Sequence, residues 1–311
     1  MSFSGEVKDE LSKQLSLARH CQLAELAAIL CFCGKITQNK NGEYRIKVQT
    51  ENEAVARKCF TLLKKAFNIY TDIIERGSAS QNRTGTYYID LFEQEECQAV
   101  VGAIKYREAV LSESNTVNPM LLKSACCKRA FLRGAYLTIG SMSDPEKSYH
   151  LEFVCSDEPR AVQIRDILIG FDIEAKIIVR KKYHVVYVKE GSGIVDTLNV
   201  MEAHVSLMKF ENLRIIKEVR NSVNRRVNCE TANISKTVNA ASKQTEDIIY
   251  IKEHYGLNNL QIGLSEMAEV RLQFPEASLN ELGQYLNPPV GKSGVNHRLR
   301  KLSELADKIR G

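Results

Sequence analysis

The chain has 311 residues, of which 44% are hydrophobic and 26% are charged, and its formal net charge is +5. This length has room for two or more domains that each bury a core, and the composition is that of a globular protein. No run of eighteen apolar residues occurs, so the sequence predicts no membrane-spanning segment. The amino end is polar and charged and does not resemble a signal peptide.

The nine cysteines are odd in number and several lie within apolar helical pattern, which predicts reduced thiols in a cytoplasm. Cys31 and Cys33 are two residues apart on a predicted helix and therefore point to different faces, while Cys126 and Cys127 are adjacent. Neither pair has the spacing of zinc ligands. The sequence therefore predicts no metal site and no cofactor.

Two segments about a hundred residues apart repeat the same order of predicted elements. Each opens with a helix, ending at 26–34 in the first copy and at 132–140 in the second. The strands and helices that follow are predicted at 44–48, 51–67, 68–75, 84–91 and 93–106 in the first copy, and at 149–153, 158–169, 173–179, 183–188 and after Gly191 in the second. Two tandem αββαββα units predict a pseudo-symmetric α+β domain over residues 1–204, with repeats at about 20–106 and 126–204.

The nine-residue openings contain small residues that permit close helix packing, and Gly34 and Gly140 are predicted to end each helix in the left-handed conformation. These openings resemble the two LAGLIDADG motifs of homing endonucleases. In that family the eighth position of each motif holds an acid, and the two acids bind the divalent cations that activate water. Here the eighth positions are Cys33 and Ile139, which cannot form an oxygen-ligand site. The resemblance therefore implies the fold without the nuclease activity.

Other carboxylates are further candidates for metal binding, and the open sheet faces are a further candidate for DNA contact. Glu25 lies earlier on the first opening helix, and Asp144 and Glu146 follow the second, where an exposed carboxylate is usually solvated surface. On the sheets, strand alternation directs Arg45 and Lys47 to one face, and His150, Glu152 and several lysines lie on the matching face of the second copy. Because this surface is mixed in sign, two interpretations stay open: a second DNA surface, or a face that is solvated or covers a protein partner or the carboxyl-terminal domain.

Residues 205–232 are predicted to link the two domains. The first part is helical in period, and 220–233 is rich in Asn and Arg and weak in apolar spacing. Arg225 and Arg226 are candidates for DNA contacts in this segment, which equally fits a solvated linker.

Residues 233–311 are predicted to be helical, with helices at 234–255 and 264–273 and a helix-turn-helix at Phe274 to Lys308. Ser278 and Glu281 have the spacing of a capping box, and Leu279, Leu282 and Leu286 form one apolar stripe. Two prolines interrupt the chain before Ser293, which is predicted to cap the second helix. That helix keeps an apolar face and presents basic and amide side chains in its first two turns, as major-groove binding requires.

The candidate DNA-binding residues of this segment are Ser278, Lys292, Ser293, Asn296, His297, Arg298, Arg300 and Lys301. Residues 205–311 hold 16 Lys and Arg against 12 Asp and Glu, so most of the positive excess lies in this third of the chain. The alternative is an ordinary amphipathic helix pair with a solvated basic face.

Several motifs together resemble the WhiA proteins of Gram-positive bacteria over essentially the whole chain. They are Asn-Arg-Arg-Val-Asn-Cys-Glu-Thr-Ala-Asn-Ile-Ser-Lys at 224–236, Arg-Ala-Phe-Leu-Arg-Gly at 129–134, Tyr-His-Leu-Glu at 149–152 and Lys-Ser-Gly-Val-Asn-His-Arg at 292–298. The resemblance implies a catalytically dead LAGLIDADG-like domain fused to a helix-turn-helix domain similar to region four of sigma factors.

The resemblance implies that the protein binds double-stranded DNA sequence-specifically. It implies a regulator of cell division and chromosome segregation, and of sporulation in relatives. Such a regulator would be cytoplasmic and associated with the nucleoid. A monomer without enzymatic activity is expected. Two alternatives stay open: a factor that binds another transcription or cell-division protein and DNA only secondarily, and an active homing endonuclease.

Overall fold

The computed structural model describes residues 2–76, 85–106 and 115–311. The chain divides into two compact units, Met1–Glu218 and Val219–Gly311, called here the amino-terminal and carboxyl-terminal units. None of the helices in the described ranges combines the length and the apolar character that a membrane span needs.

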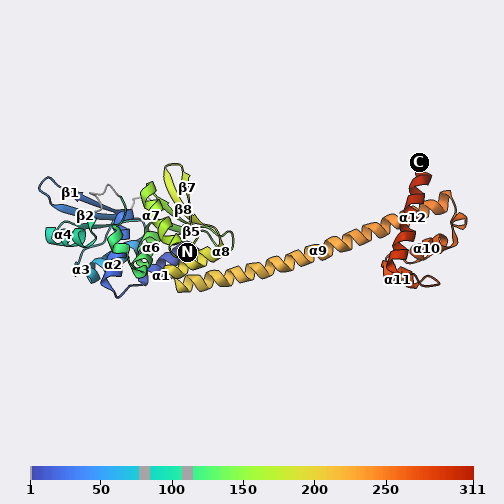
Figure 1. Ribbon diagram of the computed structural model, residues 1–311, viewed down its shortest axis with the longest axis horizontal. Coiled ribbons are helices and arrows are strands. Elements are labelled where there is room, and N and C mark those ends of the chain that lie inside the picture. The colour runs from blue at the N-terminus through green and yellow to red at the C-terminus, as the bar shows by residue number, and fades with distance from the viewer. Residues whose placement is uncertain (1, 77–84, 107–114) are drawn as a thin grey trace. The chain divides into compact units, whose positions relative to one another are not determined.

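The amino-terminal unit contains the two predicted αββαββα repeats (Figure 1). The first half consists of α1 (Phe3–Lys13), α2 (Arg19–Cys33), β1 (Gly34–Gln38), β2 (Tyr44–Thr50), α3 (Glu53–Phe67), β3 (Ile74–Arg76), β4 (Thr86–Leu91) and α4 (Gln94–Ala103). The second half consists of η1 (Pro119–Leu122), α6 (Ala125–Ile139), β5 (Gly140–Met142), β6 (Leu151–Cys155), α7 (Glu158–Ile169), β7 (Lys176–Arg180), β8 (Tyr183–Val188) and α8 (Gly191–Val200). The structure confirms the predicted repeat. It also contains helix α1 and strands β1 and β5, which the sequence patterns did not predict.

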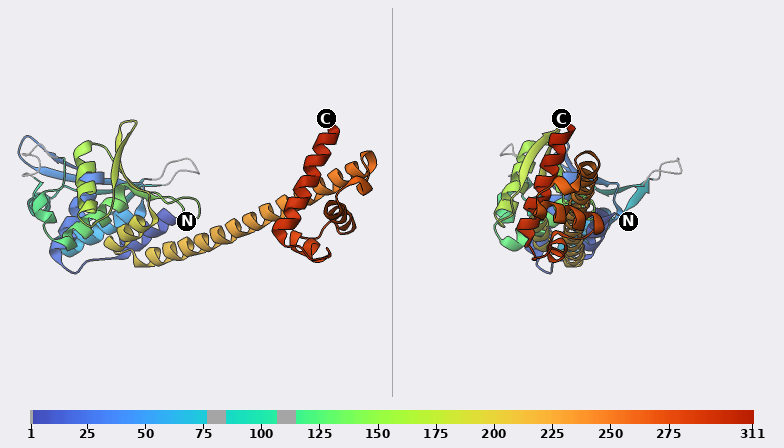
Figure 2. Two further views of the ribbon diagram at one scale, coloured as in Figure 1. Left: turned by 45° about the vertical axis from the view of Figure 1, so that its right-hand side comes forward. Right: turned by 90° about the vertical axis from the view of Figure 1, so that its right-hand side faces the viewer.

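Each half builds one antiparallel four-stranded sheet, and the strand order is the same in both: β1-β2-β4-β3 and β5-β6-β8-β7. In β2 the side chains of Tyr44, Ile46 and Val48 are buried while Arg45 and Lys47 are exposed, which confirms the predicted alternation. The two repeats of the sequence therefore fold into two halves with the same strand order. Figure 2 shows the unit from two further directions, with the long hairpin of β7 and β8 in yellow-green.

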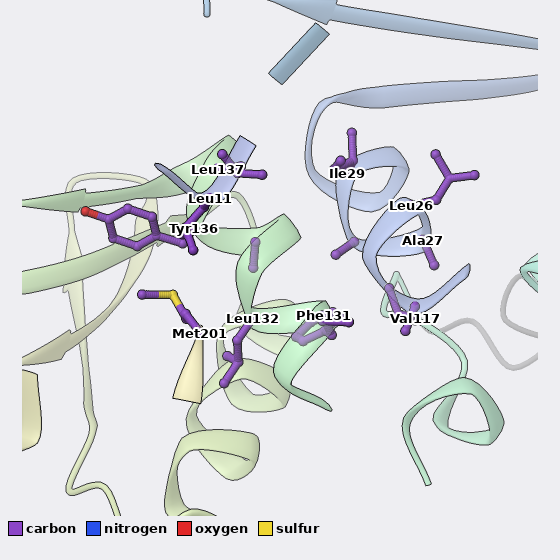
Figure 3. Close-up of a cluster of buried hydrophobic side chains, with 14 of the residues drawn as sticks. Leu11, Leu26, Ala27, Ile29, Val117, Phe131, Leu132, Tyr136, Leu137 and Met201 are labelled. Carbon is purple, nitrogen blue, oxygen red and sulfur yellow. The ribbon is translucent and has the colours of Figure 1, made fainter. Parts of the chain in front are cut away.

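The centre of this unit is the pair α2 and α6, the two motif helices. Their facing side chains form the middle of one continuous hydrophobic core, drawn in Figure 3 with Leu26 and Ile29 from α2 and Phe131 and Leu132 from α6. The backbones approach closely at Gly134, where a β-carbon would lie 2.6 Å from the carbonyl oxygen of Glu25. Small residues in the motif therefore serve the close helix packing that the sequence predicted.

The prediction that Gly34 and Gly140 adopt the left-handed conformation is wrong. Their φ angles are −94° and −79°, and the chain passes from each helix directly into β1 or β5. Glycine is needed for space instead, since a β-carbon at Gly34 would lie 2.5 Å from the carbonyl oxygen of Leu30. The immediate start of a strand leaves no turn that would require a positive φ.

The carboxyl-terminal unit is helical. It contains the later part of α9 (His204–His254), then η2 (Leu257–Asn259), α10 (Ile262–Gln273), α11 (Leu279–Gln284) and α12 (Lys292–Arg310). Its separate core is formed by Ile248, Ile251, Met267, Ala268, Leu282, Leu286, Val295, Leu299, Leu302 and Ala306. Figure 1 shows α10 and α11 gathered against α12.

The predicted linker 205–232 is helical throughout, because α9 runs without interruption from His204 to His254. No glycine or proline occurs in this stretch, and the exposed pair Arg226 and Glu230, 3.0 Å apart, supports one turn. Residues 220–233, predicted as an exposed connector, are exposed and belong to this helix, since their Asn-rich composition lowers helix propensity without breaking the helix. The domain limits at 204 and 232 stay predictions.

Candidate nucleic-acid interface

The first helix of the predicted helix-turn-helix is α11, and it begins with the predicted capping box. The Oγ of Ser278 accepts a hydrogen bond from the backbone N–H of Glu281, and the Glu281 carboxylate accepts one from the N–H of Ser278 at 2.8 Å. These bonds to its charged form lower the pKa of Glu281. Ser278 thus has a structural task at the start of α11, besides its predicted contact with DNA.

The second helix, α12, starts two residues earlier than predicted. Gly291 is its N-cap, and Ser293 lies inside the first turn, so the prediction that Ser293 caps this helix is wrong. The extended backbone that defines the cap falls on Gly291, two residues after the prolines Pro288 and Pro289. The Ser293 side chain is exposed at the amino end of α12.

The two faces of α12 differ sharply. Val295, Leu299, Leu302 and Ala306 are buried against the rest of the unit. The exposed side chains Ser293, Asn296, His297 and Arg300 follow the spacing i, i+3, i+4, i+7, and we call them the outer face of α12. Lys292 and Lys301 are exposed beside it. Six of the eight predicted residues are therefore brought together on one accessible helix surface.

Arg298 is placed differently from the other predicted residues of α12. It is half-buried, and its Nη1 donates to the carbonyl oxygen of Gly263 on α10 at 3.3 Å. Its guanidinium lies against the backbone of Gly263. Arg300, in contrast, is exposed, with its Nε 3.2 Å from Glu304 one turn along the same helix. Within this unit Arg298 joins α12 to α10, whereas Arg300 remains at the surface.

Arg271 holds the unit together and was missed by the sequence reasoning. Its buried guanidinium donates to the Gln244 side chain at 2.7 Å and to the carbonyl oxygen of Ala277, also at 2.7 Å. Burial lowers its pKa. The available signal was its place in the apolar spacing of α10, after Met267 and Ala268. The Arg271 side chain therefore connects α10 with α9 and with the segment before α11. These are the elements on which α12 packs.

Arg225 and Arg226, the further candidates, are exposed on α9. Arg226 Nε lies 3.0 Å from Glu230, so part of its charge is compensated locally.

The eighth positions of the two motifs, Cys33 and Ile139, are the last residues of α2 and α6. The Cys33 thiol donates to the carbonyl oxygen of Ile29 at 3.2 Å, and burial raises its pKa to about 12, so the thiol stays neutral. Ile139 is half-buried. Lys8 lines the same hollow as Cys33 and Thr138, and burial lowers the pKa of Lys8 to about 8. Lysine, thiol and aliphatic groups are not the ligands of a hard divalent cation. Two carboxylates, Glu51 and Glu53, also line this hollow, and Glu53 is paired with Arg57.

The remaining carboxylates have other partners. Glu25 is fully buried, 3.0 Å from Lys58 Nζ and 3.6 Å from Arg133 Nε. Burial raises the pKa of Glu25, and the two cations oppose that rise. In a surface turn, Asp144 Oδ1 accepts a hydrogen bond from the backbone N–H of Glu146, with 3.0 Å between the nitrogen and the oxygen. These acids therefore stabilise local structure.

The open sheet faces carry charges of both signs, as predicted, and several of the cations are paired with carboxylates. Arg45 Nε donates to Asp90 at 2.8 Å, with Lys47 3.9 Å from the same carboxylate. In the second sheet Glu152 lies 3.1 Å from His150 and 3.3 Å from Arg180. This surface consequently offers less uncompensated positive charge to a phosphate backbone.

Comparison with known proteins gives matches over both units. Three family models match: the WhiA N-terminal LAGLIDADG-like domain at 19–101, the WhiA LAGLIDADG-like domain at 128–220, and the WhiA C-terminal HTH domain at 223–306. The probable cell division protein WhiA of Lachnoclostridium phytofermentans is 54% identical over 313 residues, covering 100% of both chains.

Two of the similar solved structures belong to DUF199/WhiA proteins. The full-length DUF199/WhiA of Thermatoga maritima matches with a TM-score of 0.60 and 26% identity over 99% of each chain. The N-terminal LAGLIDADG domain of DUF199/WhiA matches with a TM-score of 0.50 and 23% identity, over 64% of this chain and 90% of that one, and shows a shared fold. With a LAGLIDADG-like amino-terminal unit and a carboxyl-terminal helix-turn-helix domain, and with a full-length relative at 54% identity, the chain belongs to the WhiA family.

Proposed function

We propose that this protein is a sequence-specific DNA-binding regulator of cell division and chromosome segregation that reads duplex DNA with α12 and does not cleave it. The observation that carries the proposal is the outer face of α12, where hydroxyl, amide, imidazole and guanidinium groups are exposed on successive turns. The opposite face of the same helix is buried in the core of its unit. A helix anchored on one side and polar on the other is the element that enters a major groove. The name of the similar relative, a probable cell division protein, supports the biological setting.

The residues of α12 divide into two roles in this proposal. Asn296 and Arg300 contact base edges, since Asn pairs in bidentate fashion with adenine and Arg with guanine. Lys292, Ser293 and the first backbone N–H groups of α12 bind a phosphate, because these amides point out of the helix and its dipole favours an anion.

The flanking residues set the position of the helix. His297 and Lys301 contact the sugar-phosphate backbone, and Ser278, Arg225 and Arg226 are further candidates for such contacts. Arg298 acts through its bond to Gly263, by holding α12 at a fixed angle on α10.

The test uses the full chain and a duplex selected from genomic fragments, with affinity measured by fluorescence anisotropy at fixed salt. Asn296→Ala and Arg300→Ala are each expected to reduce discrimination between the selected and a scrambled duplex by about 1–3 kcal/mol, or roughly 5- to 150-fold. Lys308→Ala is the matched control, since Lys308 is exposed on the last turns of the same helix. Unchanged discrimination in both variants, with the control also unchanged, would refute base reading by α12.

The expected absence of cleavage rests on Cys33 and Ile139, because neither residue offers an oxygen ligand at the eighth position of its motif. Incubation of the full chain with supercoiled plasmid and Mg²⁺ is expected to leave the plasmid supercoiled. Nicked or linear product that scales with protein concentration and disappears with chelator would contradict this part of the proposal.

The regulatory role is tested separately from binding. A genome-wide occupancy map is compared with the transcript profile of a strain that carries Asn296→Ala and Arg300→Ala. Changed transcription at occupied promoters is expected. Occupancy without transcript change would favour the alternative, a factor that acts in division through a protein partner.

A further inference from the structure

Four side chains that can bind metal converge at the amino ends of α2 and α6. They are His20 and Cys21 on α2 and Cys126 and Cys127 on α6, and one ligand atom from each lies within 4.8 Å of all the others. His20 Nδ1 is 3.1 Å from Cys127 Sγ, 3.3 Å from Cys21 Sγ and 4.0 Å from Cys126 Sγ. The imidazole nitrogen is therefore directed at the three thiols.

The cluster follows the internal symmetry of the fold. His20 and Cys21 are the second and third residues of α2, and Cys126 and Cys127 are the second and third residues of α6. The offset that relates Gly34 to Gly140 also relates His20 to Cys126 and Cys21 to Cys127. Equivalent positions of the two repeats thus contribute two ligands each, at the opposite end of the motif helices from Cys33 and Ile139.

The donor set and its dimensions fit zinc. One imidazole and three cysteines form one of the usual structural zinc sites, with bonds of about 2.0–2.3 Å. A tetrahedron with bonds of ~2.3 Å places sulfur atoms ~3.8 Å apart, so the widest separation here needs about 1 Å of closure. Rotation of exposed side chains supplies such a movement.

Burial divides the cluster into an anchored half and an accessible half. Cys21 and Cys127 are buried, whereas His20 and Cys126 are exposed. The buried thiols are held by the packed helices, and the exposed pair gives an ion a path from solvent. All four ligands come from the protein, which leaves no open position of the kind that a catalytic zinc keeps.

We propose that His20, Cys21, Cys126 and Cys127 bind one structural zinc ion that joins the two repeats of the amino-terminal unit at the start of their motif helices. The ion links residues that are far apart in the chain, so it stabilises the folded unit relative to the unfolded chain, which holds no preformed site. The spacing of zinc ligands is not visible along the chain because each repeat supplies only half of the ligand set.

The experiment measures the metal content of the full chain, purified without a tag under reducing conditions from zinc-containing medium and dialysed. Elemental mass spectrometry is expected to find one zinc ion per chain. His20→Gln and Cys126→Ser alter exposed ligands and are expected to leave the protein folded by circular dichroism. Each should weaken zinc affinity by at least ~100-fold in a competition titration, because even groups that only orient ligands are worth about 10- to 100-fold. Cys229→Ser, which removes an exposed cysteine on α9, is the matched control and should keep one zinc.

Two further readouts separate zinc binding from other uses of the thiols. Cobalt(II) added to the metal-free chain should give the visible absorption of a tetrahedral thiolate site, and this absorption should be lost in Cys126→Ser. Chelator should lower the unfolding midpoint of the wild-type protein and leave that of Cys126→Ser unchanged. Wild-type protein without stoichiometric metal, Cys126→Ser that keeps its metal, or a disulfide between Cys21 and Cys127 in place of the ion would each overturn the proposal.

Discussion

At the scale of single residues, the motif helices are distinguished by a buried ion network. Arg133 is fully buried and contacts Glu25 of the other repeat, Glu202 at 2.6 Å and the Ser16 hydroxyl, also at 2.6 Å. Lys58 approaches Glu25 from α3 at 3.0 Å and also donates to the carbonyl oxygens of Leu11 and Gln14. The buried carboxyl group of Glu25 therefore lies beside two cations inside the core.

Removal of one partner from this network should destabilise the amino-terminal unit. Arg133→Ala is expected to lower its free energy of unfolding by about 3–5 kcal/mol, because Glu25 would stay buried with less compensation. Urea denaturation followed by circular dichroism measures the change. Lys147→Ala, at an exposed position, is the control and should change stability by no more than about 0.5 kcal/mol. Equal stability of Arg133→Ala and the control would show that the network contributes nothing.

At the scale of elements, the closest contact between α2 and α6 depends on the absence of a side chain. A β-carbon at Gly134 would lie 2.6 Å from the Glu25 carbonyl oxygen and 2.9 Å from the β-carbon of Ala28. The neighbouring atoms are backbone and a short side chain, so the two helices themselves would have to move apart. The small residues of the motif therefore set the distance between the repeats.

Two glycine substitutions should accordingly act in opposite directions. Gly134→Ala is expected to cost about 1–3 kcal/mol through overpacking of the helix pair. Gly102→Ala, in helix α4 with no atom within 4 Å of the new β-carbon, should stabilise by about 0.5–1 kcal/mol, because Ala has the higher helix propensity. Thermal unfolding of the two variants beside wild type checks the sign of each change. A Gly134→Ala variant at least as stable as wild type would contradict the close packing.

At the scale of the whole molecule, the two units differ in whether their surface cations are paired with carboxylates or belong to an exposed polar helix face. On the sheet faces of the amino-terminal unit, Arg45 and Lys47 are paired with Asp90, and Arg180 is paired with Glu152. On α12 the polar side chains of the outer face are exposed, and its core face is buried. In the proposed function, affinity for DNA therefore comes from the carboxyl-terminal unit.

Neutralising each surface in turn in the full chain tests this division. Arg45→Ala together with Arg180→Ala is expected to leave DNA affinity and its salt dependence unchanged. Lys292→Ala together with Lys301→Ala should weaken binding to all sequences and reduce the slope of log affinity against log salt by about 1.8, since each phosphate contact contributes about 0.9. Anisotropy titrations over a range of salt concentrations give both quantities. A reduced slope in the sheet variant would assign a second DNA surface to the LAGLIDADG-like unit.

Sequence patterns predicted a structural feature correctly where that feature depends only on residues a few positions apart. The capping box at Ser278 and Glu281 and the alternation in β2 were predicted correctly, because each depends on residues a few positions apart. The start of α12 and the conformation of Gly34 were predicted wrongly. Both depend on the segment next to the helix, a proline turn in one case and an immediate strand in the other.

By itself, then, the sequence determined the tandem repeat, the helix-turn-helix and the residue types at the former nuclease positions. Only the tertiary structure decided that Arg298 contacts α10, that Glu25 and Arg133 neutralise each other, and that His20 and Cys21 meet Cys126 and Cys127. Periodicity reports which face of one element is buried, whereas these contacts join elements far apart in the chain. Their geometry is set by how closely α2 packs on α6 and α12 on α10, which no single stretch of sequence contains.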